Sequence, residues 1–186
     1  MSHPHAFAQD LRLQTPRLQL RPMGSDDAAA WFAIMADPQV MRFWNHAPWH
    51  GLAEAQAALV IDRQAYADGQ VFKLGIYRRD NDKLIGMCQC FHLEAESRRG
   101  EIGYCLASDA QGQGFMAEAL EHFVRYLGEG LKLRRLEAEI DPRNSASART
   151  LERLGFILEG TLRQRWCVGG EVSDSGLYGL LLEQNA

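Results

Sequence analysis

The chain has 186 residues, 46% of them hydrophobic and 24% charged, with a formal net charge of -4 at pH 7. This length and composition suit a globular domain with one core, and we expect residues 1–14 to be a disordered leader and residues 15–186 to be that single domain. The acidic balance argues against a nucleic-acid binder, no long uncharged apolar run could span a membrane, and the first residues lack a secretory signal pattern.

Hydrophobic periodicity assigns the first elements. Residues 17–23 alternate apolar and polar side chains, as a half-buried strand does. The SDD sequence at 25–27 can cap a short helix that ends before Pro38. The alanine-rich segment 52–69 fits a second helix, stopped by its final glycine.

The remaining elements alternate between strands and helices. Apolar residues at spacings of three and four in the segment 118–131 indicate an amphipathic helix, and Gly155 fits the C-cap of a later helix. The order predicts an α/β fold with a mixed sheet of about seven strands and helices on both faces. These later elements are strands at 71–79, 83–93 and 100–107, a helix at 118–131, a strand at 133–141, a helix from 144 to 155, and strands at 156–162 and 176–183.

The chain contains four cysteines, Cys88, Cys90, Cys105 and Cys167. Cys88 and Cys90 stand two residues apart in a predicted strand, so their side chains point to the same face. No second pair completes a zinc site, and we expect buried free thiols, with a metal or a disulfide as the alternative. This pattern favours a reducing, cytoplasmic setting.

The stretch SDAQGQGFMAEAL, at 108–120, places two glycines directly before a predicted helix. The first four N–H groups of a helix lack intrahelical partners and carry partial positive charge, so they can bind an anion such as a pyrophosphate. Gly112 and Gly114 remove Cβ atoms where such a ligand approaches and permit positive φ. The alternatives are a flexible strand-to-helix turn, or a dinucleotide-binding loop with Ala117 at the third glycine position, which the preceding strands disfavour.

A second motif lies about thirty residues downstream, where Asn144 opens a helix that ends in L-G-F (154–156). With this motif the chain resembles the GNAT superfamily of acyl-CoA-dependent N-acyltransferases. The first signature of that family, Q/R-x-x-G-x-G/A, is matched from Gln111 onward except at Met116. Within the superfamily the likeness is to the RimJ/RimL branch, which acetylates the N-termini of ribosomal proteins, and it spans roughly residues 15–183.

The resemblance implies a GNAT fold, whose mostly antiparallel sheet splays apart in the middle, here between the predicted strands 100–107 and 133–141. It also implies that acetyl-CoA lies in this opening, with its pantetheine arm on backbone groups near Cys105 and Leu106 and its pyrophosphate on the N–H groups of residues 111–117. No metal is expected. The residues implied to bind acetyl-CoA are Cys105, Leu106, Gln111, Gly112, Gln113, Gly114, Phe115, Met116, Ala117 and Asn144.

The resemblance further implies a catalytic pair. Glu101 would act through a water molecule as the general base for the amine, and Ser147 would protonate the leaving thiolate. A backbone N–H group near Leu106 would polarise the thioester carbonyl. The alternatives are that Glu101 is a surface carboxylate paired with a neighbouring arginine, that Ser147 is a neutral helix residue, and that Tyr104 or Tyr126 is the acid.

Two tryptophans, Trp44 and Trp49, lie in the segment 41–51 between the early helices. We expect them to form one wall of the acceptor site, because the corresponding loop borders the acceptor entrance in the resembled fold. A terminal hairpin over 163–175, turned at Gly169-Gly170, would form the opposite wall. The alternative is that the rings cap the core.

The implied function is transfer of an acetyl group from acetyl-CoA to a primary amine, with the α-amine of a protein N-terminus as the leading acceptor. The acidic balance favours a cationic acceptor. The alternatives are a small-molecule amine such as an antibiotic or a polyamine, a non-catalytic acyl-CoA-binding module, and a nicotinamide-dependent oxidoreductase. Neither a nucleic acid nor a membrane is expected as a partner. Dimers are frequent in the resembled family, although no segment here identifies an interface.

Overall fold

The computed structural model describes residues 7–182, so the leader assignment for residues 1–6 lies outside the described residues. An eight-stranded sheet forms its centre, in the order β1-β2-β3-β4-β5-β6-β8-β7. Neighbouring strands are antiparallel, except that β5 and β6 are parallel. The strands are β1 (Leu13–Gln14), β2 (Leu18–Arg21), β3 (Phe72–Arg78), β4 (Leu84–Glu94), β5 (Arg99–Leu106), β6 (Arg135–Ile140), β7 (Ile157–Val168) and β8 (Glu171–Leu181).

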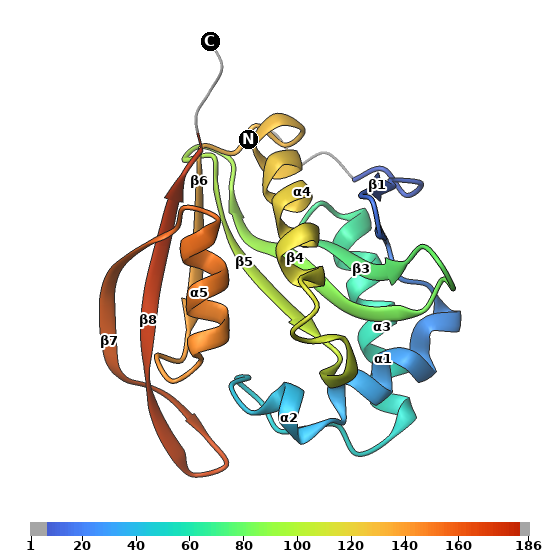
Figure 1. Cartoon of the computed structure of the whole chain (residues 1–186), viewed down its shortest axis with the longest axis horizontal. Coiled ribbons are helices and arrows are strands. Elements are labelled where there is room, and N and C mark those ends of the chain that lie inside the picture. The colour runs from blue at the N-terminus through green and yellow to red at the C-terminus, as the bar shows by residue number, and fades with distance from the viewer. Residues whose placement is uncertain (1–6, 183–186) are drawn as a thin grey trace.

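Helices cover both faces of the sheet. Figure 1 shows α4 and α5 in front of the sheet and α1 and α3 behind it. Two clusters of buried side chains correspond to these two layers, one beneath α4 and α5 and the other beneath α1 to α3. The helices are α1 (Ala28–Met35), α2 (Pro38–Met41), α3 (Leu52–Ala67), α4 (Phe115–Glu129) and α5 (Ser145–Arg153), with short 3₁₀ turns η1 (Ser25–Asp27) and η2 (Ser108–Ala110).

The expected architecture, a mixed and mostly antiparallel sheet with helices on both faces, is confirmed. The sheet has eight strands rather than about seven, because the short strand β1 lies in the segment assigned to a leader. Residues 7–14 are held against the domain in the structure. The ring of Phe7 packs on Tyr66 and Phe72, with centroids 5.1 and 4.9 Å apart, and burial of an aromatic ring stabilises such a contact.

The sheet opens between β5 and β6. These strands pair only at Arg99–Arg135, Gly100–Leu136 and Glu101–Glu137, although β5 continues to Leu106 and β6 to Ile140. Beyond Glu101 the two strands therefore diverge, as Figure 1 shows. The splayed sheet implied by the resemblance is present, and Glu101 stands at its vertex.

All four cysteines are free. Cys88 and Cys90 both lie in the cluster beneath α4 and α5, as their spacing predicts, and Cys105 is buried in the other cluster. Burial raises the pKa of Cys90 and of Cys105 to about 12, so these thiols are protonated and inert at neutral pH. Cys167 is exposed. Within residues 7–182, no helix combines the length and apolar character that crossing a membrane requires.

Candidate active site

The two glycines before α4 adopt the backbone conformation expected of them. Gly112 has a φ of +73° and Gly114, the N-cap of α4, has a φ of +78°. No side chain caps the helix at Gly114, so the first N–H groups of α4 are available to an anion. An added Cβ at Gly112 would meet no other atom within 4 Å. The space in front of this loop is therefore kept open by the absence of a side chain.

The glutamines of the first signature hold the loop itself together. The side-chain amide of Gln111 donates to the Leu106 carbonyl oxygen at 3.1 Å, and that of Gln113 donates to the Asp109 carbonyl oxygen at 2.8 Å. Phe115 is buried in the core beneath α4. These three side chains therefore shape the loop, and what remains for a ligand is backbone N–H.

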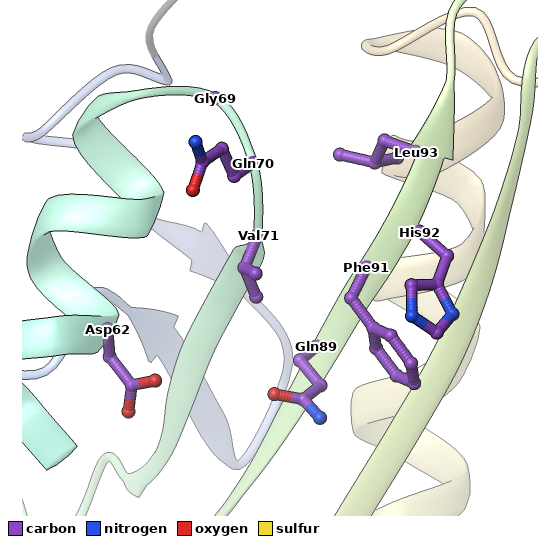
Figure 2. Close-up of a pocket in the computed structure, with 8 residues that line it drawn as sticks. All are labelled: Asp62, Gly69, Gln70, Val71, Gln89, Phe91, His92 and Leu93. Atoms are coloured by element: carbon purple, nitrogen blue, oxygen red, sulfur yellow. The ribbon is translucent and has the colours of Figure 1, made fainter.

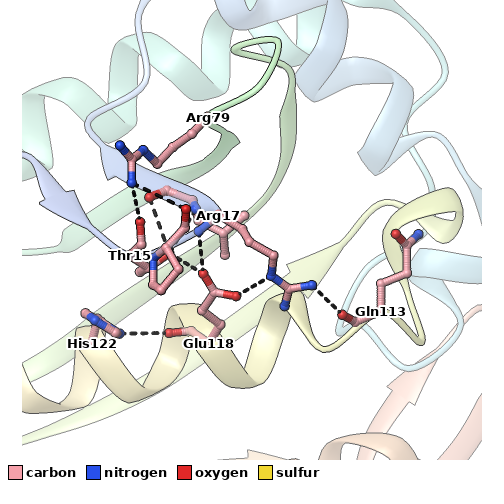
Figure 3. A network of polar contacts seen from close by, with 8 residues as sticks. Thr15, Arg17, Arg79, Gln113, Glu118 and His122 are labelled. Carbon is pink, nitrogen blue, oxygen red and sulfur yellow. Dashed lines mark hydrogen bonds and ion pairs between the residues drawn. The ribbon is translucent and has the colours of Figure 1, made fainter.

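A charged network that sequence reasoning missed braces the same loop (Figure 3). Arg17, just before β2, donates from Nε to a Glu118 carboxylate oxygen at 2.6 Å and from Nη1 to the Gln113 carbonyl oxygen at 3.0 Å. Glu118 also accepts from the backbone N–H of Arg17 at 2.9 Å and from the Thr15 hydroxyl. The guanidinium of Arg17 lies 4.4 Å from the ring centroid of Phe115. One arginine thus joins the loop, the first turn of α4 and the edge of the sheet.

The charge of Glu118 depends on this network. Burial on its own would raise the pKa of the carboxyl group. Hydrogen bonds from Thr15 and Arg17, together with the positive charge of Arg17, outweigh burial and hold the pKa of Glu118 below its usual value. Glu118 is therefore an ionised carboxylate whose negative charge is neutralised beside the anion-binding end of α4.

The backbone of β5 differs in one respect from the expectation. The N–H of Ala107 donates to the carbonyl oxygen of Ile85 at 2.8 Å. Because backbone groups alternate in an antiparallel pair, this bond directs the N–H and C=O groups of Cys105 toward β4 and those of Leu106 toward the opening. The Leu106 carbonyl is taken by Gln111. Of the two residues expected to face the donor, Leu106 therefore presents an N–H group, whereas Cys105 is paired with β4.

Three polar residues meet beside the opening on the face covered by α4 and α5. Asn144 caps α5, with its side-chain oxygen accepting from the Ser147 N–H at 3.1 Å. The Tyr104 hydroxyl donates to the Ser147 carbonyl oxygen at 3.3 Å. Burial raises the pKa of Tyr104 to about 12, and its hydrogen bond with Ser147 opposes this only in part. Tyr126, by contrast, stacks on Phe72 at 5.3 Å, two strands away from β5 in the sheet.

Glu101 lies on the opposite face of the sheet from Tyr104, because side chains alternate along β5. Its carboxylate oxygen is 3.1 Å from Nδ1 of His92, and the Glu101 side chain is 22% exposed. The neighbouring Arg99 pairs instead with Glu137, at 3.0 Å. Of the two arginines considered as surface partners of Glu101, Arg98 and Arg99, Arg99 is thus paired elsewhere, and Glu101 contacts an imidazole.

The structure describes both segments that were expected to form walls of the acceptor site. Trp44 and Trp49 are half-buried and pack against the cluster beneath α1 to α3, and the ring of Trp49 lies 5.9 Å from that of Trp31. Capping of the core, the alternative considered for these rings, is therefore at least part of their role. Gly169 and Gly170, with φ of +58° and +85°, turn the hairpin between β7 and β8.

The hairpin is tied to the opening by a residue that sequence reasoning did not single out. The indole Nε1 of Trp166 donates to Glu139 at 2.6 Å, and Arg165 pairs with the same carboxylate at 3.3 Å. Glu137 and Glu139 stand two residues apart on β6, and Glu137 is the register partner of Glu101. Three carboxylates therefore share one face of the sheet beside the vertex.

Comparisons with known proteins agree with this geometry. Residues 17–157 match the family described as acetyltransferase (GNAT) domain. The chain is 32% identical to an uncharacterized N-acetyltransferase, p20, of Bacillus licheniformis, over 94% of this chain and 98% of that protein. It is 28% identical to the [ribosomal protein uS5]-alanine N-acetyltransferase of Escherichia coli, over 91% and 90%. A solved structure of Mycobacterium smegmatis RimJ in complex with CoA-disulfide superposes with a TM-score of 0.81 at 24% identity, covering 88% of this chain and 81% of that one, which shows the shared fold.

Proposed function

Because the chain belongs to the GNAT acetyltransferase family, and is therefore an N-acetyltransferase, we propose that it acetylates the α-amine of a protein N-terminus. The observation that carries the proposal is the uncapped, glycine-opened N-terminus of α4 next to the gap between β5 and β6. The similarity to the uS5-alanine enzyme supports a protein acceptor. The free cysteines suit a reducing compartment, and we place the enzyme in the cytoplasm.

The residues of the opening fit acetyl-CoA, which supplies an activated acetyl thioester when bound. The N–H groups of residues 112–117 would hold the pyrophosphate, since Gly112 places no side chain in the open space before the loop. The N–H of Gln111, expected to join them, donates instead to the Ser108 carbonyl oxygen at 3.3 Å. The side chain of Asn144 and the N–H of Leu106 would orient the pantetheine arm and the thioester carbonyl. Backbone N–H groups would thus bind acetyl-CoA at both its pyrophosphate and its thioester.

Glu101 is the proposed general base. Of the three carboxylates on its face of the sheet, Glu137 and Glu139 are paired with arginines, whereas Glu101 contacts the imidazole of His92. Glu101 is therefore assigned the role of accepting a proton, through a water molecule, from an amine whose own pKa is about 7.7–8.0.

Ser147 is the proposed proton donor to the departing thiolate. Ser147 belongs to α5, which covers the face of the sheet opposite Glu101. The base and the acid would therefore act from the two sides of the reacting bond. Tyr104 also borders this face, but its O–H is directed at the Ser147 carbonyl oxygen. A thiol has a pKa near 8.5, so its anion is a good leaving group and needs only a weak acid nearby.

Release of free thiol from acetyl-CoA tests the proposal. The acceptors are a hexapeptide that begins with alanine, the same peptide with its α-amine already acetylated, spermidine, and an aminoglycoside. We expect turnover with the first peptide and none with its blocked form. Turnover with only the small amines would refute the peptide acceptor, and CoA binding without turnover of any acceptor would instead identify a binding module.

A further inference from the structure

A pocket of about 510 Å³ lies between the start of β3 and the far end of β4, and it shares His92 with the site described above. This volume is within the range of about 300–1,000 Å³ that is usual for ligand sites. Figure 2 shows the lining residues Asp62 on α3 and Gln89 on β4, with the segment 69–71 along one side. Val71, Phe91 and Leu93 supply its apolar surface.

The pocket forms because the backbone N–H groups just before β3 bond to the end of α3 and so do not extend the strand. Gly69 has a φ of +70°, and the N–H groups of Gln70 and Val71 donate to the Ala65 carbonyl oxygen at 2.8 and 3.2 Å. Strand β3 therefore starts only at Phe72. Its last pair with β4 is Phe72–Cys90, so within the described residues no strand pairs with the β3 side of β4 at residues 91–93. An open strand edge of this kind can bind an extended peptide.

The pocket adjoins the proposed base. Phe91 is the register partner of Glu101, and Gln89 is the register partner of Gly103. Because Gly103 has no side chain, Gln89 can lie across β5, and its amide nitrogen is 3.3 Å from where a Cβ of Gly103 would stand. His92 lines the pocket and also contacts Glu101. Adjacent strands are about 4.8 Å apart and an extended residue spans about 3.3 Å, so the second or third residue of an acceptor bound at Glu101 would reach the pocket.

The charged groups of the pocket favour a peptide acceptor over a polyamine. Asp62 is paired with Lys73 at 2.7 Å, and the Lys73 side chain is only 11% exposed. The negative charge of Asp62 is therefore already neutralised, which leaves the amides of Gln70 and Gln89 and the imidazole of His92 as the polar side chains of the lining. Amides recognise peptide N–H and C=O groups, whereas a polyamine would require free carboxylates.

We propose that this pocket binds the residues that follow the α-amine of a peptide acceptor, as an extended, uncharged polar segment along the open edge of β4. The inference rests on the proposed peptide acceptor and deepens it. It predicts that the enzyme distinguishes a peptide from a single amino acid, and that the pocket carries this preference.

The test compares kcat/KM for two acceptors, alanine amide and an uncharged hexapeptide amide that begins with alanine. Gln89→Ala removes an amide from the pocket, and Gln70→Trp adds bulk at its exposed rim. Each should lower kcat/KM for the hexapeptide by roughly five- to tenfold, the effect of one or two lost hydrogen bonds, and leave the value for alanine amide nearly unchanged. Gln56→Ala, at an exposed position on α3, is the matched control and should change neither.

The outcomes separate this inference from the proposed function. If wild-type enzyme acetylates the hexapeptide but neither pocket variant changes the ratio between the acceptors, the pocket is not the peptide site. An equal fall for both acceptors would also overturn the inference, because it would assign Gln89 to the reaction centre. If wild-type enzyme acetylates no peptide while it acetylates spermidine, the peptide acceptor itself is wrong.

Discussion

Replacement of Arg17 by methionine tests whether the charged network shapes the donor site. Arg17 reaches the loop at the Gln113 carbonyl oxygen and the helix at Glu118. Methionine keeps much of the aliphatic stem over Phe115 but removes both hydrogen bonds and the positive charge. Without Arg17, the Glu118 carboxylate would stand uncompensated beside the site of a pyrophosphate, and the loop would lose its outer support.

The expected loss of CoA affinity follows from how exposed the Arg17 side chain is. Hydrogen bonds to charged groups contribute about 1.5–3 kcal/mol when buried, but the Arg17 side chain is 48% exposed, which reduces the effect to about 1–1.5 kcal/mol. CoA should therefore bind Arg17→Met roughly five- to tenfold more weakly. Isothermal titration calorimetry with CoA measures this directly.

Two further variants make the measurement specific. Arg79→Met is the matched control, since Arg79 donates to the carbonyl oxygens of Thr15 and Pro16 in the same segment without touching the loop. In the double variant Arg17→Met/Glu118→Gln the uncompensated charge is gone. Its loss of CoA affinity should therefore be smaller than the sum of the losses in the two single variants. A dissociation constant for Arg17→Met within twofold of wild type, or one equal to that of Arg79→Met, would refute the reasoning.

The other predictions concern the loop, the acid–base pair and pH. Gly112→Ala should destabilise the protein by about 1 kcal/mol in urea unfolding, because a residue with a Cβ is strained at positive φ, and should weaken CoA further by placing a methyl group in the ligand's path; unchanged CoA affinity would contradict this. Glu101→Gln should lower kcat about a hundredfold with little change in CoA affinity, and an unaltered kcat would remove Glu101 as the base. Ser147→Ala should reduce kcat more than Tyr104→Phe does, and the reverse order in steady-state kinetics would make the tyrosine the acid. Because the pKa of Glu118 is lowered on folding, its contribution to stability is present above its unfolded pKa of about 4.3 and lost as pH falls through the folded value; thermal unfolding should therefore show wild type and Glu118→Gln converging below about pH 4, and a constant difference down to pH 2 would be evidence against the linkage.

The features that sequence reasoning predicted well are local ones. Gly112 and Gly114 predicted an uncapped helix start, because the positive φ that glycine permits depends on no distant residue. The Gly169-Gly170 turn was likewise predictable, since positive φ at two successive residues is what a two-residue hairpin requires. The strands on either side of the opening, predicted at 100–107 and 133–141, lie at Arg99–Leu106 and Arg135–Ile140.

The features that were missed depend on contacts across the chain. Arg17 and Glu118 are 101 positions apart, so no short pattern connects them. His92 lies in the predicted strand 83–93, where simple alternation would place it on the face opposite Phe91. In the structure a register shift in β4 and a φ of +48° at His92 break the alternation and turn the imidazole toward Glu101. The strand β1 was missed because two residues are too few for a periodic signal.

The most direct measurement follows the backbone amides of the protein by ¹H–¹⁵N NMR during a titration with CoA. The amides of residues 112–117 and of Leu106 should show the largest changes, because they are the donors proposed to hold the pyrophosphate and the pantetheine arm. The same titration with Arg17→Met should reach the same end point at higher CoA concentration. Saturation with CoA that leaves these amides unshifted, or that shifts residues on another face of the sheet, would contradict the assignment of the donor site.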